Sequence, residues 1–554
     1  MSRPRFAAPL VGLVFGLAFT QSARAQDAAP APTAPPLGDA RPSPPSDVER
    51  PRIAKLVLRA DGPEEPVDAK GERWDAWAWA RLRATSLSSF ALDTSGTPNA
   101  QKKLVESRLR VGGVGRPLDW LDVALELDAV SGIAFGDTTP LGTRLDDQVL
   151  RYRQDEKLSL GVVDLRQAFV AVTLPFGQLR MGRMATSWGT GMVGNSGAGE
   201  ADFGDRRFGD IAHRIAFGTR PLSQTSGAPE LVRELTVFAT VDAIWRDENA
   251  DWSRGDRAYA GALGARTETR DGAAGVLGTY RTQRDRGDPF RPDHQDTYVH
   301  AGAVDGYGRL VVARIDDART VQIEAEAAMI RGTTSRPYLD ENRAGATIRS
   351  FGAVARAQYD DTSARLRVRA EVGYASGDDD PHDDVVRTFT FDPDYKVGLV
   401  LFEQVLPRLQ LRSNDRLGDP GLLATPPSAT RFLVSQGSVT NAMYVNPVVR
   451  FRPWAPLDLR LGYLGARSAG DLIDPYNSAK IGGYNATYGG KAPGSRALGH
   501  ELDGSVKLTL PVPIVRLRIG VEGAVFFAGA ALDGVGGGPF GTVTLVRGAL
   551  DGWW

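Results

Sequence analysis

The chain contains no cysteine and only five histidines among its 554 residues. The absence of cysteine excludes a disulfide scaffold, thiolate zinc sites, iron-sulfur clusters and a cysteine nucleophile. So few histidines leave little for a metal centre, and we predict neither a metal nor another cofactor. Charge of one dominant sign is also missing, since 66 Lys+Arg against 67 Asp+Glu give a net charge of -1. A uniformly basic nucleic-acid binder is therefore not expected.

Long apolar runs are missing except at the N-terminus. Arg3 and Arg5 precede an uncharged run from Phe6 to Thr20, which is followed by Ala23-Arg24-Ala25. The run is too short for a membrane-spanning helix of about 20 residues, and the Ala-x-Ala ending is typical of a cleavage site. We therefore predict a cleaved signal peptide over residues 1–25, with a buried helix as the alternative.

The following stretch has little that could form a packed core. Ten prolines lie between Gln26 and Pro66 among Ala, Asp and Glu residues, so we predict a Pro/Ala-rich periplasmic linker over residues 26–72. Beyond it, the charge-free run from Phe432 to Val449 is interrupted by polar residues and by Pro447. Helical membrane spans are therefore not expected in the mature chain. Of the structures that can cross lipid, only the closed β-barrel remains.

Apolar and polar residues alternate with a period of two in many segments. From Leu121 to Ala129 every odd position is apolar, and from Ala364 to Tyr374 the apolar positions alternate with three arginines and a glutamate. The same pattern holds from Glu234 to Ala243, from Thr320 to Met329 and from Val515 to Phe527. Such segments of about 9 to 13 residues match tilted membrane strands, because one face could contact lipid while the other requires water.

These patterns predict an all-β fold, a transmembrane antiparallel β-barrel over residues 73–554. Its length allows about 16 to 18 strands, and 18 is our best prediction. Short turns are expected at 113–117, 360–362 and 452–456, and long loops at 185–227, 283–295, 377–387 and 466–498. The alternative is a soluble sandwich, which would bury its apolar face in a core.

Three short blocks resemble a known family. They are Leu165-Arg166-Gln167-Ala168-Phe169 with Leu179 to Met184 and Trp188-Gly189, then Gly373 to Asp380 with Arg387-Thr388-Phe389 and Phe391-Asp392-Pro393, and finally Leu498 to Asp503. Together they resemble alginate-export-type outer-membrane porins, although Met184 stands where that family usually has Gln. The resemblance implies a monomeric 18-stranded barrel with an arginine-rich lumen that passes an anionic polysaccharide.

Arginine is the principal cation, since the chain has only nine lysines. Arginine pairs bidentately with carboxylates and phosphates, so rows of it facing a narrow pore would attract anions. The alternative is that these arginines pair with Asp and Glu for structure. The predicted lumen residues are Arg108, Arg110, Arg180, Arg365, Arg367, Arg369, Glu371, Arg450, Arg452, Arg460, Arg516 and Arg518.

Other candidate sites are weaker. The carboxylates from Asp378 to Asp384 could bind calcium, but a solvated acidic loop is the favoured interpretation. His500 and Ser505 fall on opposite faces of one predicted strand, so we expect no catalytic centre and no enzyme activity. The C-terminal Trp553-Trp554 resembles the aromatic ending that the barrel-assembly machinery uses.

The sequence thus predicts a bacterial outer-membrane channel for passive passage of an anionic or sugar-like solute. The expected partners are outer-membrane lipid, the barrel-assembly machinery and that anionic or carbohydrate solute, with no nucleic acid and a monomeric state. The alternative is a structural or surface-adhesion barrel with a plugged lumen and no transport role.

Overall fold

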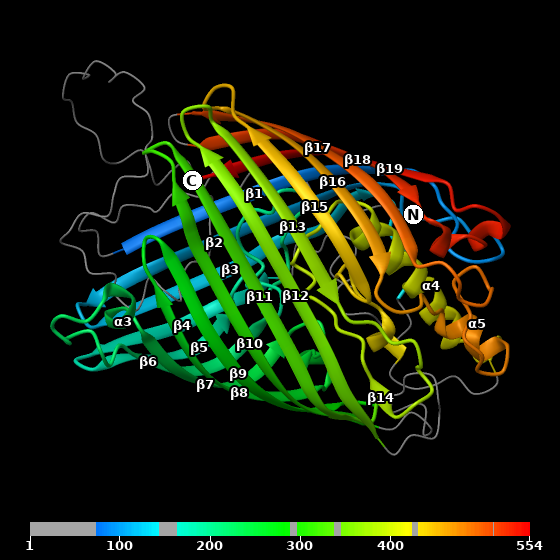
Figure 1. Cartoon of the computed structure of the whole chain (residues 1–554), viewed down its shortest axis with the longest axis horizontal. Helices are drawn as coiled ribbons and strands as arrows, with labels where there is room; N and C mark the ends of the chain where they lie inside the picture. Colours follow the sequence, from blue (N-terminus) through cyan, green and yellow to red (C-terminus); the bar gives the residue numbers. More distant parts are fainter. Residues whose placement is uncertain (1–73, 143–162, 288–295, 337–344, 424–429, 513–514) are drawn as a thin grey trace, which may run out of the picture. The chain divides into compact units, whose positions relative to one another are not determined.

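The predicted barrel is confirmed by a computed structural model, which describes residues 74–142, 163–287, 296–336, 345–423, 430–512 and 515–554 (Figure 1). Eighteen strands of the described chain form one ring in sequence order, and each is antiparallel to the next. The ring closes where β1 pairs with β19, with Trp79 opposite Trp553. The predicted signal peptide and linker lie outside the described residues and stay predictions.

The strands of the ring have the following bounds. They are β1 (Trp74–Leu87), β2 (Lys103–Leu118), β3 (Leu121–Gly136), β4 (Val163–Leu174), β5 (Gly177–Ala185), β6 (Ile211–Thr219), β7 (Thr236–Arg246), β8 (Arg257–Glu268), β9 (Gly272–Asp285), β10 (Thr297–Arg314), β11 (Arg319–Thr334), β12 (Ala346–Asp361), β13 (Leu366–Ala375), β15 (Ala442–Phe451), β16 (Leu457–Ser468), β17 (Ala497–Pro511), β18 (Arg516–Ala528) and β19 (Thr542–Trp553). The two-residue strand β14 (Val385–Val386) pairs in parallel with β12 and lies in a loop.

Alternation along the strands separates an apolar outer face from a polar inner face. In β3, Val123 and Leu125 are 37% and 49% exposed, whereas Ala124 between them and the flanking Asp122 and Glu126 are buried. Large apolar side chains stay exposed in this way around the ring, as Leu263 in β8 and Leu461 in β16 show. A soluble sandwich would bury these residues, so the exposed apolar face excludes it.

The two rims of the ring differ in their connections. One rim carries mostly short turns and holds both the start of β1 and the end of β19, together with the short helix α3 (Glu230–Arg233). The other rim carries long loops, with α4 (Leu406–Leu417) and α5 (Pro475–Lys480) gathered there (Figure 1). None of the described helices has the length and apolar character to span a bilayer.

Two predicted connections need correction. The segment 113–117 belongs to β2, and the turn to β3 consists of Asp119 and Trp120. The glycines in this segment mimicked a turn, but Gly115 instead makes room for an aromatic side chain, since a Cβ there would lie 2.1 Å from the Trp74 ring. The predicted long loop 185–227 contains β6, which is short and mixes polar with apolar residues.

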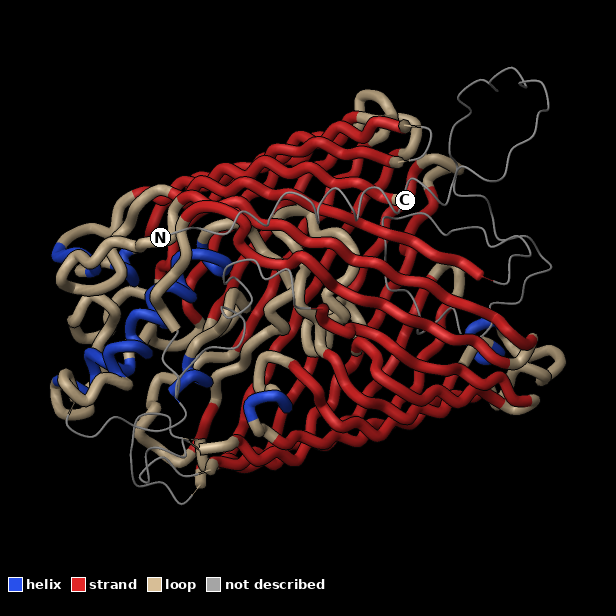
Figure 2. The backbone as a smooth tube through the Cα atoms, turned by 180° about the vertical axis from the view of Figure 1, so that it is seen from behind, coloured by secondary structure: helices blue, strands red, loops and turns tan. Residues whose placement is uncertain are grey.

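Two loop segments fold into the ring from the long-loop rim. One is residues 186–210 between β5 and β6, and the other is residues 376–441 between β13 and β15, of which 424–429 are not described. Loop tubes are visible within the wall of strands in Figure 2. The segments are called here the first and the second infolded segment.

Candidate functional site

The inner face of the wall is lined by ion pairs between neighbouring strands. The Arg110 guanidinium donates to both carboxylate oxygens of Asp128 at 2.7 and 2.9 Å. The Arg166 Nε donates to Glu126 at 2.8 Å, and Arg214 pairs with Asp242 at 2.7 Å. These pairs are mostly buried, so each carboxylate compensates a charge that burial would otherwise penalise.

The first infolded segment crosses the interior and pairs with distant strands. Its Glu200 contacts Lys507 of β17 at 2.7 Å and Arg518 of β18 at 3.0 Å, and its Asp205 contacts Arg81 of β1 at 2.6 Å. Burial alone would raise the pKa of Glu200, but the charges of Lys507, Arg460 and Arg518 hold that pKa well below its ordinary value. These acidic side chains therefore stay ionised and tie the segment to strands far from β5 and β6.

The second infolded segment carries a buried apolar cluster. Phe391, Leu399, Phe402 and Leu409 are almost fully buried, and they pack with apolar residues at the strand ends next to the long loops. The Glu501 carboxylate of β17 accepts hydrogen bonds from the backbone N–H groups of residues 399, 400 and 401, at 2.5 to 2.8 Å. This carboxylate satisfies the first amides of the helical part that leads into α4.

The two infolded segments are joined to each other through backbone amides. The Asp394 carboxylate of the second segment accepts from the N–H groups of Arg207, Phe208 and Gly209 at 2.7 to 2.9 Å. Gly209 has φ of +67°, and a Cβ there would lie 2.1 Å from the carbonyl oxygen of Ser196. Only glycine allows this close approach. The two infolded segments thus form one connected body inside the ring rather than two independent loops.

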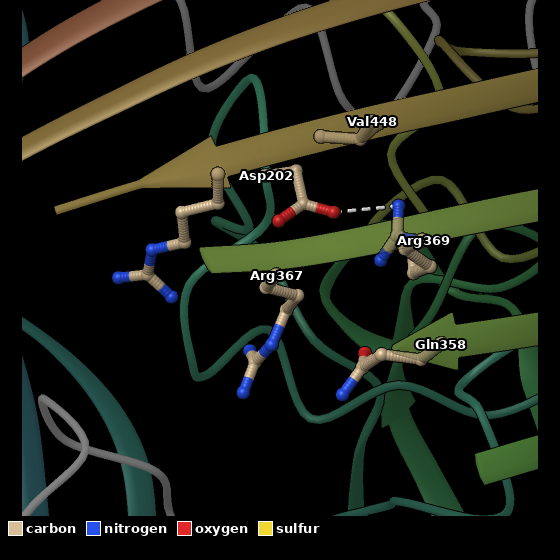
Figure 3. A pocket seen from close by; sticks show the side chains of 6 residues that line it. Asp202, Gln358, Arg367, Arg369 and Val448 are labelled. Atoms are coloured by element: carbon tan, nitrogen blue, oxygen red, sulfur yellow. Dashed lines mark ion pairs between the residues drawn. The ribbon is translucent and has the colours of Figure 1, made fainter. Parts of the chain in front are cut away.

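A small pocket of about 30 Å³ lies where the first segment meets β12, β13 and β15 (Figure 3). It is lined by Asp202, Gln358, Arg367, Arg369, Val448 and Arg450. Arg369 pairs with Asp202 at 2.6 Å and Arg367 with Asp360 at 2.6 Å. Three guanidinium groups therefore line a polar recess, and the acidic partner of one of them comes from the infolded segment.

The predicted lumen residues fall into three groups by burial and by position in their strands. Arg108, Arg110, Arg180, Glu371, Arg450 and Arg460 are buried on the inner face of strands. Arg367, Arg369 and Arg518 are partly buried there and make ion pairs with carboxylates. The remaining three lie at strand ends: Arg365 is exposed in the turn before β13 with φ of +54°, Arg452 follows β15, and Arg516 begins β18 and is exposed.

Sequence reasoning missed several residues that hold the interior together. Arg81 and Arg83 of β1 both contact Asp205, and they alternate with apolar residues, so the pattern used elsewhere would have found them. Arg356 of β12 bridges Glu324 and Glu371 at 2.9 and 2.6 Å in the same way. The acidic residues of the first infolded segment carry no such signal, because they lie in a Gly-rich loop without periodicity.

The acidic loop is exposed at Asp379, Asp380 and Asp384, in keeping with the favoured interpretation, but Asp378 is buried. Asp378 is 2% exposed and accepts from the Arg387 backbone at 3.0 Å and guanidinium at 3.3 Å, while Asp379 pairs with Arg496 at 3.0 Å. The Asp378 carboxylate is thus held in internal contacts, whereas Asp379 stays exposed while it pairs with Arg496.

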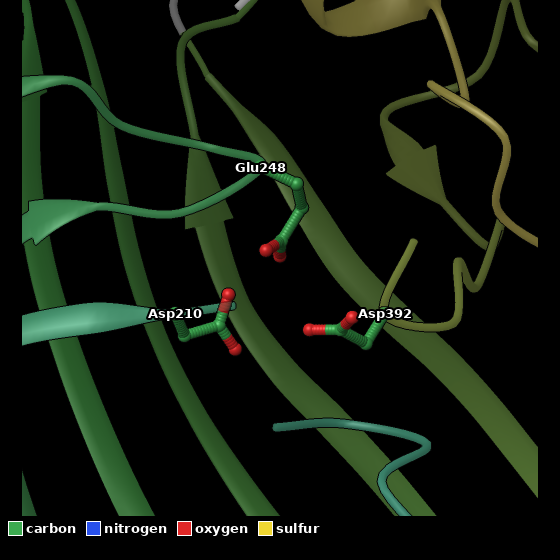
Figure 4. Close-up of side chains that lie close together, drawn as sticks. All are labelled: Asp210, Glu248 and Asp392. Carbon is green, nitrogen blue, oxygen red and sulfur yellow. The ribbon is translucent and has the colours of Figure 1, made fainter. Parts of the chain in front are cut away.

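Three other carboxylates lie close together, and no motif in the sequence indicates this cluster. Asp210, Glu248 and Asp392 come from three separate segments, and their oxygens lie within 4.8 Å of one another (Figure 4). Burial and the charges of Asp392 and Glu248 raise the pKa of Asp210 well above its ordinary value. A proton at this position lessens the repulsion among the three groups.

The chain was compared with known families, curated proteins and solved structures. No family model and no curated protein matches it. Among solved structures, OccK11 (OpdR) of Pseudomonas aeruginosa is 11% identical, with 87% of this chain and 95% of that chain covered and a TM-score of 0.43. OccAB2 of Acinetobacter baumannii is 10% identical (87% and 98% covered, TM-score 0.45). OpdK of P. aeruginosa, solved with vanillate, is 12% identical (87% and 98%, TM-score 0.43). At these identities the similarity is limited to the barrel architecture.

Proposed function

We propose that this chain is a monomeric channel of the bacterial outer membrane, through which an anionic or sugar-like solute passes passively. The supporting observation is a closed strand ring with an apolar outer face and a charged inner face, in which three arginines line one recess beside the infolded segment. Guanidinium groups that line a pore attract anions and repel cations. The long-loop rim faces outward and the short-turn rim faces the periplasm, as in other outer-membrane barrels.

Bilayer conductance of the purified chain tests this function. The expected result is stepwise, anion-selective conductance that falls when Arg367 and Arg369 are both changed to Gln. Arg319→Gln at the short-turn rim provides the matched control, because its exposed guanidinium pairs with Asp316 in a turn away from the recess. Cation selectivity in the wild-type protein would contradict the proposal.

A narrower proposal concerns the alginate-export-type family. It is supported by the positions of the residues that carry the resemblance. Arg166 donates to the carbonyls of Ser196 and Phe208 at 2.7 Å, and Glu501 holds the second infolded segment. The resembling blocks therefore supply contacts that hold the infolded segments. Blockage of the conductance by an oligomer of uronic acids, and not by a neutral oligosaccharide of equal length, would support this narrower assignment.

The second candidate function is a plugged structural barrel without transport. It is favoured by the apolar cluster of the second infolded segment, which packs among the strand ends of the long-loop rim. Under this alternative, the wild-type protein is closed in bilayers, and deletion of residues 398–435 opens it. Open wild-type channels would instead exclude the plugged barrel.

A further inference from the structure

Arginines oppose each other on the outer face of the barrel next to the long-loop rim. Arg331 of β11 stands directly opposite Arg349 of β12 in the strand register, and both are exposed. Arg257 of β8 stands directly opposite Arg284 of β9 in the same way, and both are also exposed. We call these four arginines, with the exposed His300 of β10 between them, the basic belt.

Neighbouring apolar residues place the basic belt on the lipid side of the wall. Met329, two residues before Arg331 in β11, is 42% exposed, and Phe351, two residues after Arg349 in β12, is 43% exposed. Residues two apart in a strand share a face. Tyr259 and Tyr280, which share the faces of Arg257 and Arg284, are 48% and 59% exposed. Exposed aromatic residues of this kind mark the boundary between hydrocarbon and headgroups.

Like charges at directly opposed positions destabilise a strand pair. Within the described residues, Arg331 and Arg349 have no carboxylate partner, while Arg257 donates to the backbone carbonyls of Trp252 and Asp256. Arg284 alone has an acidic partner, Asp296 at 2.7 Å. The outward-facing Arg319 of the opposite rim differs, since it pairs with Asp316. The basic belt therefore has an excess of positive charge that the described chain does not neutralise.

We propose that the basic belt binds the phosphate groups of a phosphorylated glycolipid in the outer leaflet. Guanidinium groups bind phosphate oxygens bidentately, and two opposed arginines can share one phosphate. A lipid anchored beside the wall also brings its acyl chains against the exposed apolar residues of β11 and β12. The proposal rests on the outward placement of the long-loop rim under the proposed function, but it concerns the outer surface and not the channel.

Native mass spectrometry of the detergent-purified full chain tests the proposal with diphosphorylated lipid A as the probe. The variant is Arg331→Gln with Arg349→Gln, and the matched control is Arg319→Gln on the outer face at the opposite rim. We expect the double variant to bind lipid A about 25-fold more weakly, since each of the two basic residues near an anionic surface contributes a factor of about five. The control should bind as the wild type does, and Arg331→Lys with Arg349→Lys should recover part of the binding.

Two further probes identify the source of the phosphate. Dephosphorylated lipid A should bind the wild type as weakly as intact lipid A binds the double Gln variant. Inorganic phosphate at equal concentration should not displace the lipid, because it lacks the acyl chains. Equal binding of lipid A to wild type and double variant, or full displacement by inorganic phosphate, would overturn the proposal. The conductance of the double variant should equal that of the wild type. A loss of lipid binding can therefore be told apart from a loss of the channel function.

Discussion

Asp202 of the first infolded segment pairs with Arg369 of β13 at 2.6 Å, and this ion pair forms one wall of the arginine-lined recess. The pair joins the strand wall to the body that the two infolded segments form. It neutralises Arg369 from the infolded segment, whereas Arg367 and Arg450 pair with the wall residues Asp360 and Asp458. The acidic segment can therefore set how much positive charge a permeating ion meets.

Replacing Asp202 by Asn should make the channel more anion-selective. The change leaves Arg369 without its closest carboxylate, and one uncompensated charge at about 4 Å is worth about 1 kcal/mol in water. The ratio of anion to cation permeability should rise by up to about fivefold, and the rise should shrink as salt is added. Reversal potentials in asymmetric salt measure this ratio.

The matched control for that experiment is Asp316→Asn. Asp316 pairs with Arg319 in an exposed turn of the short-turn rim, away from the recess. Its replacement should leave the reversal potential unchanged. Equal shifts from Asp202→Asn and Asp316→Asn would mean that selectivity depends on net charge and not on the recess.

Replacing Glu501 by Gln should loosen the second infolded segment without unfolding the barrel. The carboxylate accepts from three consecutive amides, and the amide side chain of Gln offers one neutral oxygen in its place. Loss of such a buried contact costs about 1 to 3 kcal/mol. Hydrogen exchange at residues 399–401 should accelerate by about tenfold or more, and the open-channel current should become noisier.

His500→Asn on the same strand serves as the control for Glu501→Gln. His500 lies on the opposite face and is exposed, where the Tyr463 hydroxyl contacts its Nδ1 at 2.6 Å. This variant should leave exchange at residues 399–401 as it is in the wild type. If Glu501→Gln also leaves it unchanged, the apolar cluster alone holds the segment.

The strand register predicts a strong asymmetry between neighbouring positions of β13. Val368 is 37% exposed on the outer face, whereas Arg367 lines the recess on the inner face. An arginine facing lipid near the mid-membrane costs about 2 to 4 kcal/mol. Val368→Arg should therefore lower the yield of heat-modifiable barrel more than Arg367→Val does. Equal yields, measured by gel shift after refolding, would contradict this register.

The period-two alternation was enough to predict the barrel and the inner position of most of the arginines, because side-chain direction in a strand follows from sequence parity alone. Arg365 shows the limit of that rule. It continued the alternation of β13, yet it lies in the preceding turn with a positive φ. Where a strand begins depends on the turn geometry, which parity does not describe.

The body inside the barrel could not be predicted in the same way. Its contacts join residues far apart in sequence, as Asp394 and Gly209 or Glu501 and Leu399 do. No periodicity connects such residues, and the apolar residues from 389 to 411 were compatible with any buried loop. The blocks that resemble a porin family included Glu501 and Asp392, but the resemblance gave no geometry for them.

The contact between α4 and α5 should depend on pH through Asp474. This carboxyl is buried, accepts from the Ser413 hydroxyl of α4, and caps α5 through the Tyr476 N–H at 3.2 Å. Burial raises its pKa from 3.8 to about 6, although the contacts with Ser413 and Tyr476 act in the opposite direction.

The sign of the effect follows from that raised pKa. Between pH 3.8 and 6 the docked form holds a proton that the undocked form releases, so docking is most stable below about pH 4 and weakens as the pH rises to about 6. The total change is of order 3 kcal/mol, and little further change is expected above that range. Hydrogen exchange at residues 476–480, corrected for the intrinsic pH dependence, should show this loss of protection.

Asp474→Asn should remove the pH dependence of this exchange, whereas Asp384→Asn, at an exposed carboxyl of another loop, should retain it. Protection that rises with pH across this range would show that the ionised carboxylate is the form that holds the two helices together.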